Sequence, residues 1–178
     1  MRIDPVRHVL DGLGVSYALI GAHAMAARGY PRLTVDVDLL TTDARVLEPS
    51  MWSDIERQGG TVDARRGDAD DPLGGVVHVL LADGSDIDVV VGKWEWEARI
   101  IDRAEVMSVA GAEIRVPRTA DLILMKLAAG GYLDLRDAAA LLALGDREDV
   151  VREVEAHIDE VRPGVLAAWR ELLSSVDR

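Results

Sequence analysis

Several short stretches of the chain alternate between apolar and polar residues with a period of two, which is typical of β-strands. Strands are therefore predicted at residues 15–20, 35–40, 61–65, 74–81, 85–91, 106–109 and 113–116. The fourth and fifth of these flank Ala82-Asp83-Gly84, whose Asp-Gly pair favours a hairpin turn.

Between and after these strands, apolar residues recur at helical spacing. Helices are predicted at residues 5–12, 22–28, 44–58, 93–103, 120–129, 133–144, 149–158 and 164–176. Pro49 falls inside the third helix and is expected to kink it or to separate its first turn. The pattern predicts an α/β (α+β) fold, with a core in residues 1–116 and a helical C-terminal part, residues 117–178, packed on it.

One predicted strand carries two acidic residues. Residues two apart in a strand point to the same face, so Asp36 and Asp38 are expected side by side, with Val35, Val37 and Leu39 on the other face. Two close carboxylates repel each other, and burial makes this worse. The pair therefore indicates a solvated face or a bound cation, for which Mg²⁺, with its preference for oxygen ligands, is a natural candidate.

A third carboxylate strengthens this interpretation. Asp88 lies in the apolar run Asp86-Ile87-Asp88-Val89-Val90-Val91. If this strand lies beside the first, three carboxylates converge, which is enough for a two-metal clamp in phosphoryl chemistry. Asp86 shares a face with Asp88 and is the rival third ligand, but Asp88 lies deeper in the strand.

The turn before the Asp pair is a candidate phosphate site. Gly21-Ala22 joins the strand at 15–20 to a helix, and a helix N-terminus offers free N–H groups to a phosphate. The alternative is a tight structural turn. Arg32 could reach a phosphate or the acidic cluster, or it is simply a charge at the strand edge. His23 could contact a substrate or be structural.

Lys126 is the basic residue in an otherwise apolar predicted helix. Burying a lysine is costly unless it is paired. Lys126 is therefore expected either to serve the site or to extend its ammonium group to the surface.

Taken in order, these motifs resemble a known family. Gly21-Ala22, a short helix, Arg32-Leu-Thr-Val-Asp36-Val-Asp38 and a later strand Asp resemble the nucleotidyltransferases of the DNA polymerase β superfamily. Asp121-Leu-Ile-Leu-Met-Lys126 followed by Arg136-Asp137 resembles the AbiEii-type toxins and their minimal relatives. The resemblance covers about residues 17–144.

The resemblance implies a polymerase-β-like core with a mixed sheet flanked by helices. It implies that Asp36 and Asp38 hold both Mg²⁺ ions, and that Asp88 completes the second site and helps to deprotonate the attacking hydroxyl. It also implies that Lys126 reaches the triphosphate of an NTP and that Asp137 can hold Lys126. A component of a toxin–antitoxin pair is the role it implies most readily, with an antitoxin as the protein partner.

Composition narrows the possible partners. The formal net charge is −12, which disfavours RNA as the acceptor without excluding a small basic groove. The chain has no cysteine, hence no disulfide framework or thiolate metal site. No secretion signal or membrane-spanning run is evident in its sequence, and a cytoplasmic location is expected.

The sequence supports three hypotheses. The first is a Mg²⁺-dependent nucleotidyltransferase that transfers an NMP from an NTP to a hydroxyl of RNA, protein or a small alcohol such as an aminoglycoside. The second is a catalytically weak protein of the same fold that acts as a protein-binding module. The third is that the acidic cluster is only a surface feature of the fold.

Overall fold

The computed structural model describes residues 2–32, 34–144 and 146–176. Its contacts divide the chain into two compact units. The sheet unit comprises the described residues within 1–24 and 32–117, and the helical unit those within 25–31 and 118–178. The helix α2 (Gly21–Ala27) contributes residues to both units.

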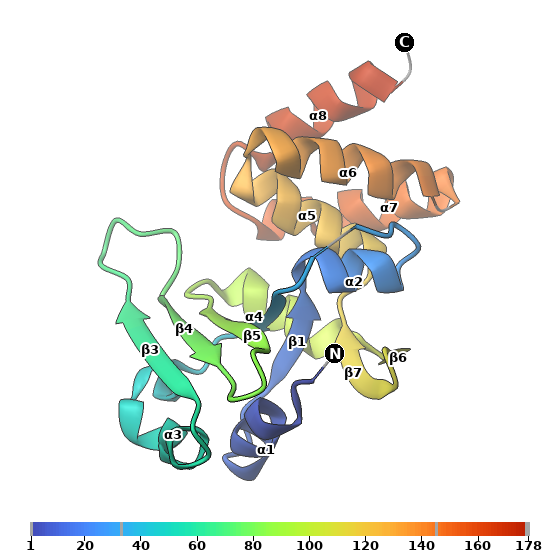
Figure 1. The fold of residues 1–178 in the computed structure, drawn as a ribbon. Coiled ribbons are helices and arrows are strands. Elements are labelled where there is room, and N and C mark those ends of the chain that lie inside the picture. The colour runs from blue at the N-terminus through green and yellow to red at the C-terminus, as the bar shows by residue number, and fades with distance from the viewer. Residues whose placement is uncertain (1, 33, 145, 177–178) are drawn as a thin grey trace. The chain divides into compact units, whose positions relative to one another are not determined.

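The sheet unit is built on a five-stranded mixed sheet with the strand order β1-β2-β5-β4-β3 (Figure 1). Its strands are β1 (Tyr17–Ile20), β2 (Val37–Thr41), β3 (Thr61–Arg66), β4 (Gly75–Leu80) and β5 (Asp86–Val91). Strands β2 and β5 are parallel, and the other neighbouring pairs are antiparallel. The parallel pair therefore joins two segments that lie far apart in the sequence.

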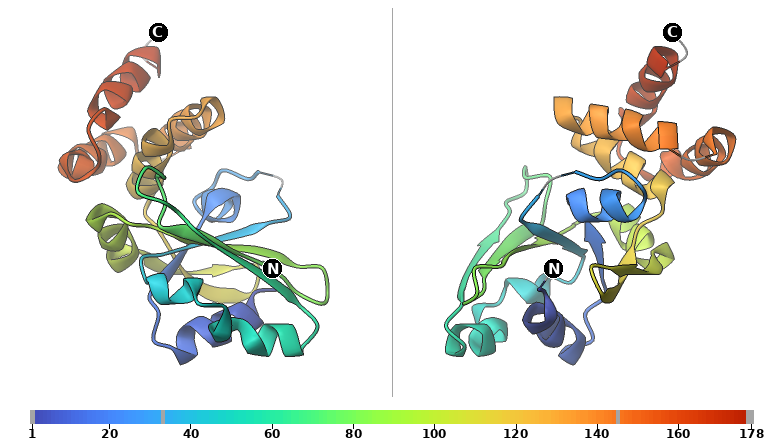
Figure 2. Two further views of the ribbon diagram at one scale, coloured as in Figure 1. Left: turned by 90° about the vertical axis from the view of Figure 1, so that its left-hand side faces the viewer. Right: turned by 45° about the vertical axis from the view of Figure 1, so that its right-hand side comes forward.

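One face of this sheet forms the core of the unit. Leu39, Ile87 and Val89 on the parallel pair are completely buried, as are Val77 and Val79 on β4. The elements that accompany the sheet are α1 (Asp4–Gly12), the 3₁₀ turns η1 (Ala44–Leu47) and η2 (Pro49–Trp52), α3 (Ser53–Arg57) and α4 (Glu95–Arg103). The left view of Figure 2 shows α1 and the segment from η1 to α3 along one side of the sheet. Burial of this apolar face sets which side chains the other face presents.

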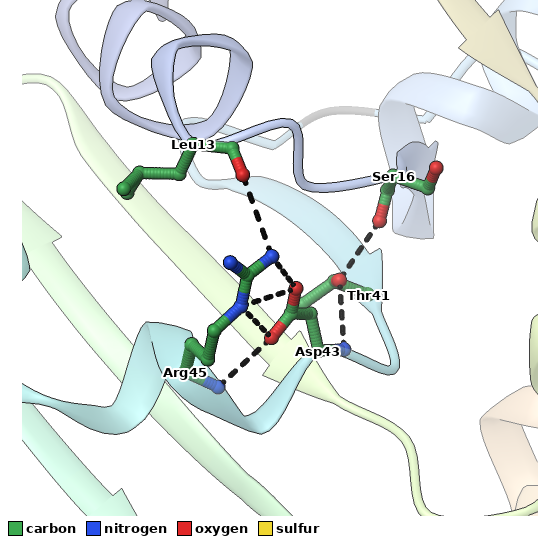
Figure 3. A network of polar contacts seen from close by, with 5 residues as sticks. All are labelled: Leu13, Ser16, Thr41, Asp43 and Arg45. Atoms are coloured by element: carbon green, nitrogen blue, oxygen red, sulfur yellow. Dashed lines mark hydrogen bonds and ion pairs between the residues drawn. The ribbon is translucent and has the colours of Figure 1, made fainter.

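A polar network holds the end of β2 against the loop between α1 and β1 (Figure 3). The buried Thr41 donates through Oγ1 to the carbonyl of Ser16 at 2.8 Å and accepts from the Asp43 N–H at 3.1 Å. Asp43 caps η1 by accepting from the Arg45 N–H at 3.0 Å, and Arg45 also donates to the carbonyl of Leu13 at 3.4 Å. The strand is thus fixed at the end opposite to Asp38.

The rest of the sheet unit is a hairpin of β6 (Glu105–Val109) and β7 (Ala112–Val116), in which β7 contacts β1. The helical unit contains α5 (Thr119–Ala129), α6 (Tyr132–Leu144), α7 (Arg147–His157), η3 (Ile158–Glu160) and α8 (Val165–Val176). Helix α5 contacts α6, α7 and α8 and carries much of the core, including Ile123 and Leu124. No helix in the described parts of the chain is long and apolar enough to cross a membrane.

The structure confirms the predicted fold class and the hairpin, and it corrects two predictions. The helix expected at residues 44–58 is two 3₁₀ turns followed by the short α3, because Pro49 begins a new turn after Glu48. The strand expected at residues 35–40 begins only at Val37, and Val35 is 86% exposed and not part of the buried face. Gly145, which follows the helix predicted at residues 133–144, lies outside the described residues, and the predicted domain boundary at residue 116 stays a prediction.

The buried carboxyl group of Glu97 gives a test of how α4 packs against the chain at Gly92. Glu97 on α4 is buried, accepts a hydrogen bond from the Trp94 N–H at 2.8 Å, and occupies the space where a side chain on Gly92 would lie. Desolvation raises the pKa of Glu97 above its ordinary value. Ionisation of Glu97 is therefore less favourable in the folded chain than in the unfolded chain.

We expect the free energy of unfolding of Glu97→Gln to increase relative to that of the wild type as the pH rises. Below the unfolded pKa of about 4.3 both states are protonated, and above it the wild type loses stability until the folded pKa is passed. Urea unfolding at a series of pH values measures this difference in the free energy of unfolding. Glu95→Gln, at an exposed position of the same helix, is the control. A pH-independent difference for Glu97→Gln would contradict the prediction.

Candidate active site

A row of polar side chains crosses the sheet on the face opposite to the core. Asp38 on β2 is paired in register with Asp88 on β5, Asp88 with His78 on β4, and His78 with Asp63 on β3. Residues paired directly across neighbouring strands share a face. The condition set out from the sequence, that the strand of Asp88 lies beside the strand of Asp38, is met, and the parallel pairing places the two residues directly opposite each other.

His78 lies among the carboxylates of this row. Its Nδ1 is 2.8 Å from Oδ1 of Asp88 and 3.3 Å from Oδ1 of Asp86. The hydrogen bond to Asp88 is the main cause that raises the pKa of His78 above its ordinary value. Asp86 and Asp88, the two rivals for the third ligand, thus lie on one face and share one imidazole.

Gly21 allows the carboxylate of Asp38 to approach the chain closely. Gly21 has a φ of +64°, and a Cβ added there would lie 2.0 Å from Oδ2 of Asp38. No residue with a side chain can occupy this position unless Asp38 moves. The conformation and the contact together explain why glycine stands at this turn.

Asp36 precedes β2 instead of lying within it. Its N–H donates to Oγ1 of Thr34 at 3.3 Å, and the same hydroxyl donates to the Asp36 carbonyl, also at 3.3 Å. This local turn takes the place of sheet pairing, so the prediction that Asp36 lies in the same strand as Asp38 is wrong. That the two carboxylates project to the same side stays a prediction. Asp36 and Arg32 are both exposed.

The remaining predicted site residues lie in α2 and in the helical unit. Ala22 and His23 lie in the first turn of α2 and are both half-buried, and burial lowers the pKa of His23. In the helical unit, Lys126 Nζ lies 2.8 Å from Oδ1 of Asp134 and 3.1 Å from Oδ2 of Asp137. The pairing of Lys126 with Asp137 agrees with what the resemblance implies, and it satisfies a largely buried ammonium group.

Sequence reasoning missed His78, Asp63 and Asp134, and it included Thr34 in the motif that leads to Asp36 without giving it a role. His78 had a readable signal, because counting back symmetrically from the turn at Ala82–Gly84 pairs it with Asp88. Asp134 lies eight positions from Lys126, with a helix break between them, so helical spacing alone does not bring the two together.

Comparison with solved structures shows which fold carries this site. The solution structure of the antibiotic-resistance factor ANT(2″)-Ia matches with a TM-score of 0.55 and 18% identity over 98% of this chain and 92% of that one. A crystal structure of ANT(2″)-Ia in complex with adenylyl-2″-tobramycin matches with a TM-score of 0.51 and 19% identity over 87% and 95%.

An antigenic nucleotidyltransferase-like protein from Paracoccidioides brasiliensis matches with a TM-score of 0.50 and 18% identity over 93% of this chain and 88% of that one. The chain has the nucleotidyltransferase fold. No family model matches the sequence, and no curated protein matches it either. The evidence for this fold is therefore structural.

The contact between Gly21 and Asp38 can be tested with a matched glycine. Gly14 has nearly the same φ, +63°, but a Cβ there would meet nothing within 4 Å. We expect Gly14→Ala to cost only the strain of a left-handed alanine, about 1–2 kcal/mol. Gly21→Ala should cost clearly more, because the methyl group must also displace Asp38.

Urea unfolding of the single variants and of Gly21→Ala combined with Asp38→Ala measures this difference. Removal of the Asp38 carboxylate should bring the cost of Gly21→Ala most of the way down to that of Gly14→Ala, because only the Cβ of residue 38, 3.2 Å from the added methyl group, then remains close. Equal costs for the two glycine variants in the wild-type background would show that the close contact has no energetic effect.

The cluster in the helical unit gives a second test. Asp137 is more buried than Asp134, with side-chain exposed fractions of 6% and 29%. We expect Asp137→Ala to destabilise the protein by about 2 kcal/mol, because the largely buried ammonium group of Lys126 then loses one of its two carboxylate partners. Asp134→Ala should destabilise the protein less, because the Asp134 carboxylate is more exposed. The costs of Asp137→Ala and Lys126→Met should add to more than that of the double variant. Additive free energies of unfolding would argue against an ion pair.

Proposed function

We propose that the protein is a Mg²⁺-dependent nucleotidyltransferase that transfers an NMP from an NTP to an acceptor hydroxyl. The observation that carries this proposal is the register pairing of Asp38 with Asp88, beside the Gly21 turn of a nucleotidyltransferase fold. The fit of Mg²⁺ rests on the chemistry of the donor set. Carboxylate oxygens are the ligands that Mg²⁺ prefers, and Asp36, Asp38 and Asp88 supply them.

Each of these residues has a proposed role. Asp36 and Asp38 would hold the metal ions, and Asp88 would complete the second metal site. When bound, Mg²⁺ would neutralise the phosphate charge of the nucleotide. In the transfer, the acceptor oxygen forms a bond to the α-phosphorus, the bond from that phosphorus to the bridging oxygen breaks, and pyrophosphate leaves. Asp88 would take the proton of the acceptor hydroxyl as this bond forms.

The phosphate contacts are also proposals. The lack of a side chain at Gly21 supports close approach of a phosphate to the backbone at Gly21 and Ala22. Arg32, exposed on the segment that leads to Asp36, is a proposed phosphate contact. Lys126 is the proposed cation for the departing pyrophosphate, and its present partners Asp134 and Asp137 would compete with a phosphate for it.

The acceptor class is open among RNA, a protein hydroxyl and a small alcohol. The complex of ANT(2″)-Ia with adenylyl-2″-tobramycin supports including an aminoglycoside. The net charge of −12 favours a cationic acceptor over an anionic one. A toxin role of the AbiEii type, with an antitoxin partner, stays a prediction from sequence resemblance, as does the cytoplasmic location. The alternative of a protein-binding module predicts nucleotide binding without turnover.

Label transfer tests the proposal directly. The protein is incubated with Mg²⁺ and each α-labelled NTP, and total RNA, lysate protein and an aminoglycoside panel are offered separately. We expect label on one acceptor class, and a rate lowered about a hundredfold or more by Asp38→Asn or Asp88→Asn. Asp54→Asn, an exposed carboxylate on α3, is the control and should leave the rate unchanged.

Transfer that survives in both Asp38→Asn and Asp88→Asn would place the chemistry elsewhere. Absence of transfer to every acceptor, with NTP still bound, would favour the binding module.

A further inference from the structure

The imidazole in the polar row calls for a chemical explanation. A site made only for Mg²⁺ needs oxygen ligands, yet the side chain nearest to Asp88 on β4 is His78. His78 belongs to an interior strand of the sheet, and Asp86 and Asp88 lie on the strand next to it. All three side chains keep partial access to solvent, so an ion can reach them from solution.

The distances among the three side chains fit a metal centre. Each offers one ligand atom, and these atoms all lie within 4.8 Å of one another. Two ligands of a tetrahedral Zn²⁺ with bonds of about 2.0–2.1 Å stand about 3.3–3.4 Å apart, and two ligands at right angles around an octahedral ion stand about 3.0 Å apart. The 3.3 Å from His78 Nδ1 to Asp86 lies in this range, whereas the 2.8 Å to Asp88 is a hydrogen bond that a bound ion would replace and lengthen slightly.

The ligand type then indicates which metal. Imidazole nitrogen is a good ligand for Zn²⁺, Co²⁺ and other first-row transition metals, whereas Mg²⁺ favours oxygen. We propose that His78, Asp86 and Asp88 form a divalent metal site that binds a transition-metal ion such as Zn²⁺ in preference to Mg²⁺. This set differs from the Asp36, Asp38 and Asp88 set of the proposed reaction, although the two share Asp88.

Metal binding at this site does not depend on nucleotidyl transfer. A consequence for catalysis, namely that the transition-metal ion replaces one Mg²⁺ during transfer, rests on the proposed function. The experiment therefore measures binding of the metal alone, so that its failure and a failure of label transfer are separate results.

The test compares Co²⁺, which reports its ligands through visible absorption, with Mg²⁺ at a fixed pH above neutrality, where imidazole can act as a ligand. Titration calorimetry of the full chain gives both affinities. We expect wild type to bind Co²⁺ more tightly than Mg²⁺. His78→Gln should weaken Co²⁺ binding about tenfold or more and change Mg²⁺ binding far less.

Two further variants complete the set. Asp86→Asn should weaken Co²⁺ binding, because it removes a charged ligand. His8→Gln, an exposed histidine on α1 outside the cluster, should leave both affinities unchanged. Thermal unfolding without metal checks that each variant is folded.

A measurement on wild type needs no substitution. Paramagnetic Co²⁺ at sub-stoichiometric amounts should broaden or shift the imidazole NMR signals of His78 and spare those of His8. Co²⁺ affinity that is no greater than Mg²⁺ affinity, or that is unchanged in His78→Gln, would overturn the proposal. His78 would then serve only as an ion-pair partner of the two carboxylates.

Discussion

The parallel pairing of β2 with β5 is the constraint on which the candidate site depends. Leu39, Ile87 and Val89 are completely buried on one face of this pair, and a strand alternates its faces residue by residue. A register slip of one residue in either strand would bury the aspartate of that strand, Asp38 or Asp88, and expose its apolar residues. The same burial that forms the core therefore holds two carboxylates opposite each other on the other face.

Gathering negative charge in this way has an electrostatic cost, and neighbouring residues reduce it in different ways. His78 places an imidazole between Asp86 and Asp88, and Arg65 on β3 pairs with Asp63 at 2.6 Å. Solvent access to Asp86 and Asp88 reduces it further. A bound dication would also reduce the repulsion among these carboxylates. The stability of the sheet is therefore linked to the chemistry proposed for its polar face.

The sequence predicted the strands, the hairpin and the position of Asp86 and Asp88 on the same face of one strand, because each of these depends on local periodicity. The position of β5 beside β2 could be stated only as a condition, since pairing between distant segments leaves no local pattern. The turn at Asp36 escaped prediction because the Thr34 hydroxyl competes with sheet pairing, a choice that alternation of residue types does not encode.

Three further features could be predicted from the sequence only in part. The 3₁₀ turns around Pro49 share their apolar spacing with an α-helix, so the pattern located the break without distinguishing the two kinds of helix around it. Lys126 was identified by its chemistry, as the one cation in an apolar helix, while its partner Asp134 depends on how two helices pack. Roles that a resemblance implies for Gly21, Arg32 and Asp137 concern a bound nucleotide, and no contact within the protein alone can establish them.

The outermost strand β3 has a further consequence. It stands at the end of the sheet order, and Thr61, Asp63, Arg65 and Arg66 along it are exposed. Asp63 is paired with Arg65, and Arg66 is paired with Glu48 of the preceding segment. An edge strand that carries charges of both signs is a poor template for addition of a strand from another molecule. The polar row can therefore extend to the rim of the sheet without making that rim a site of aggregation.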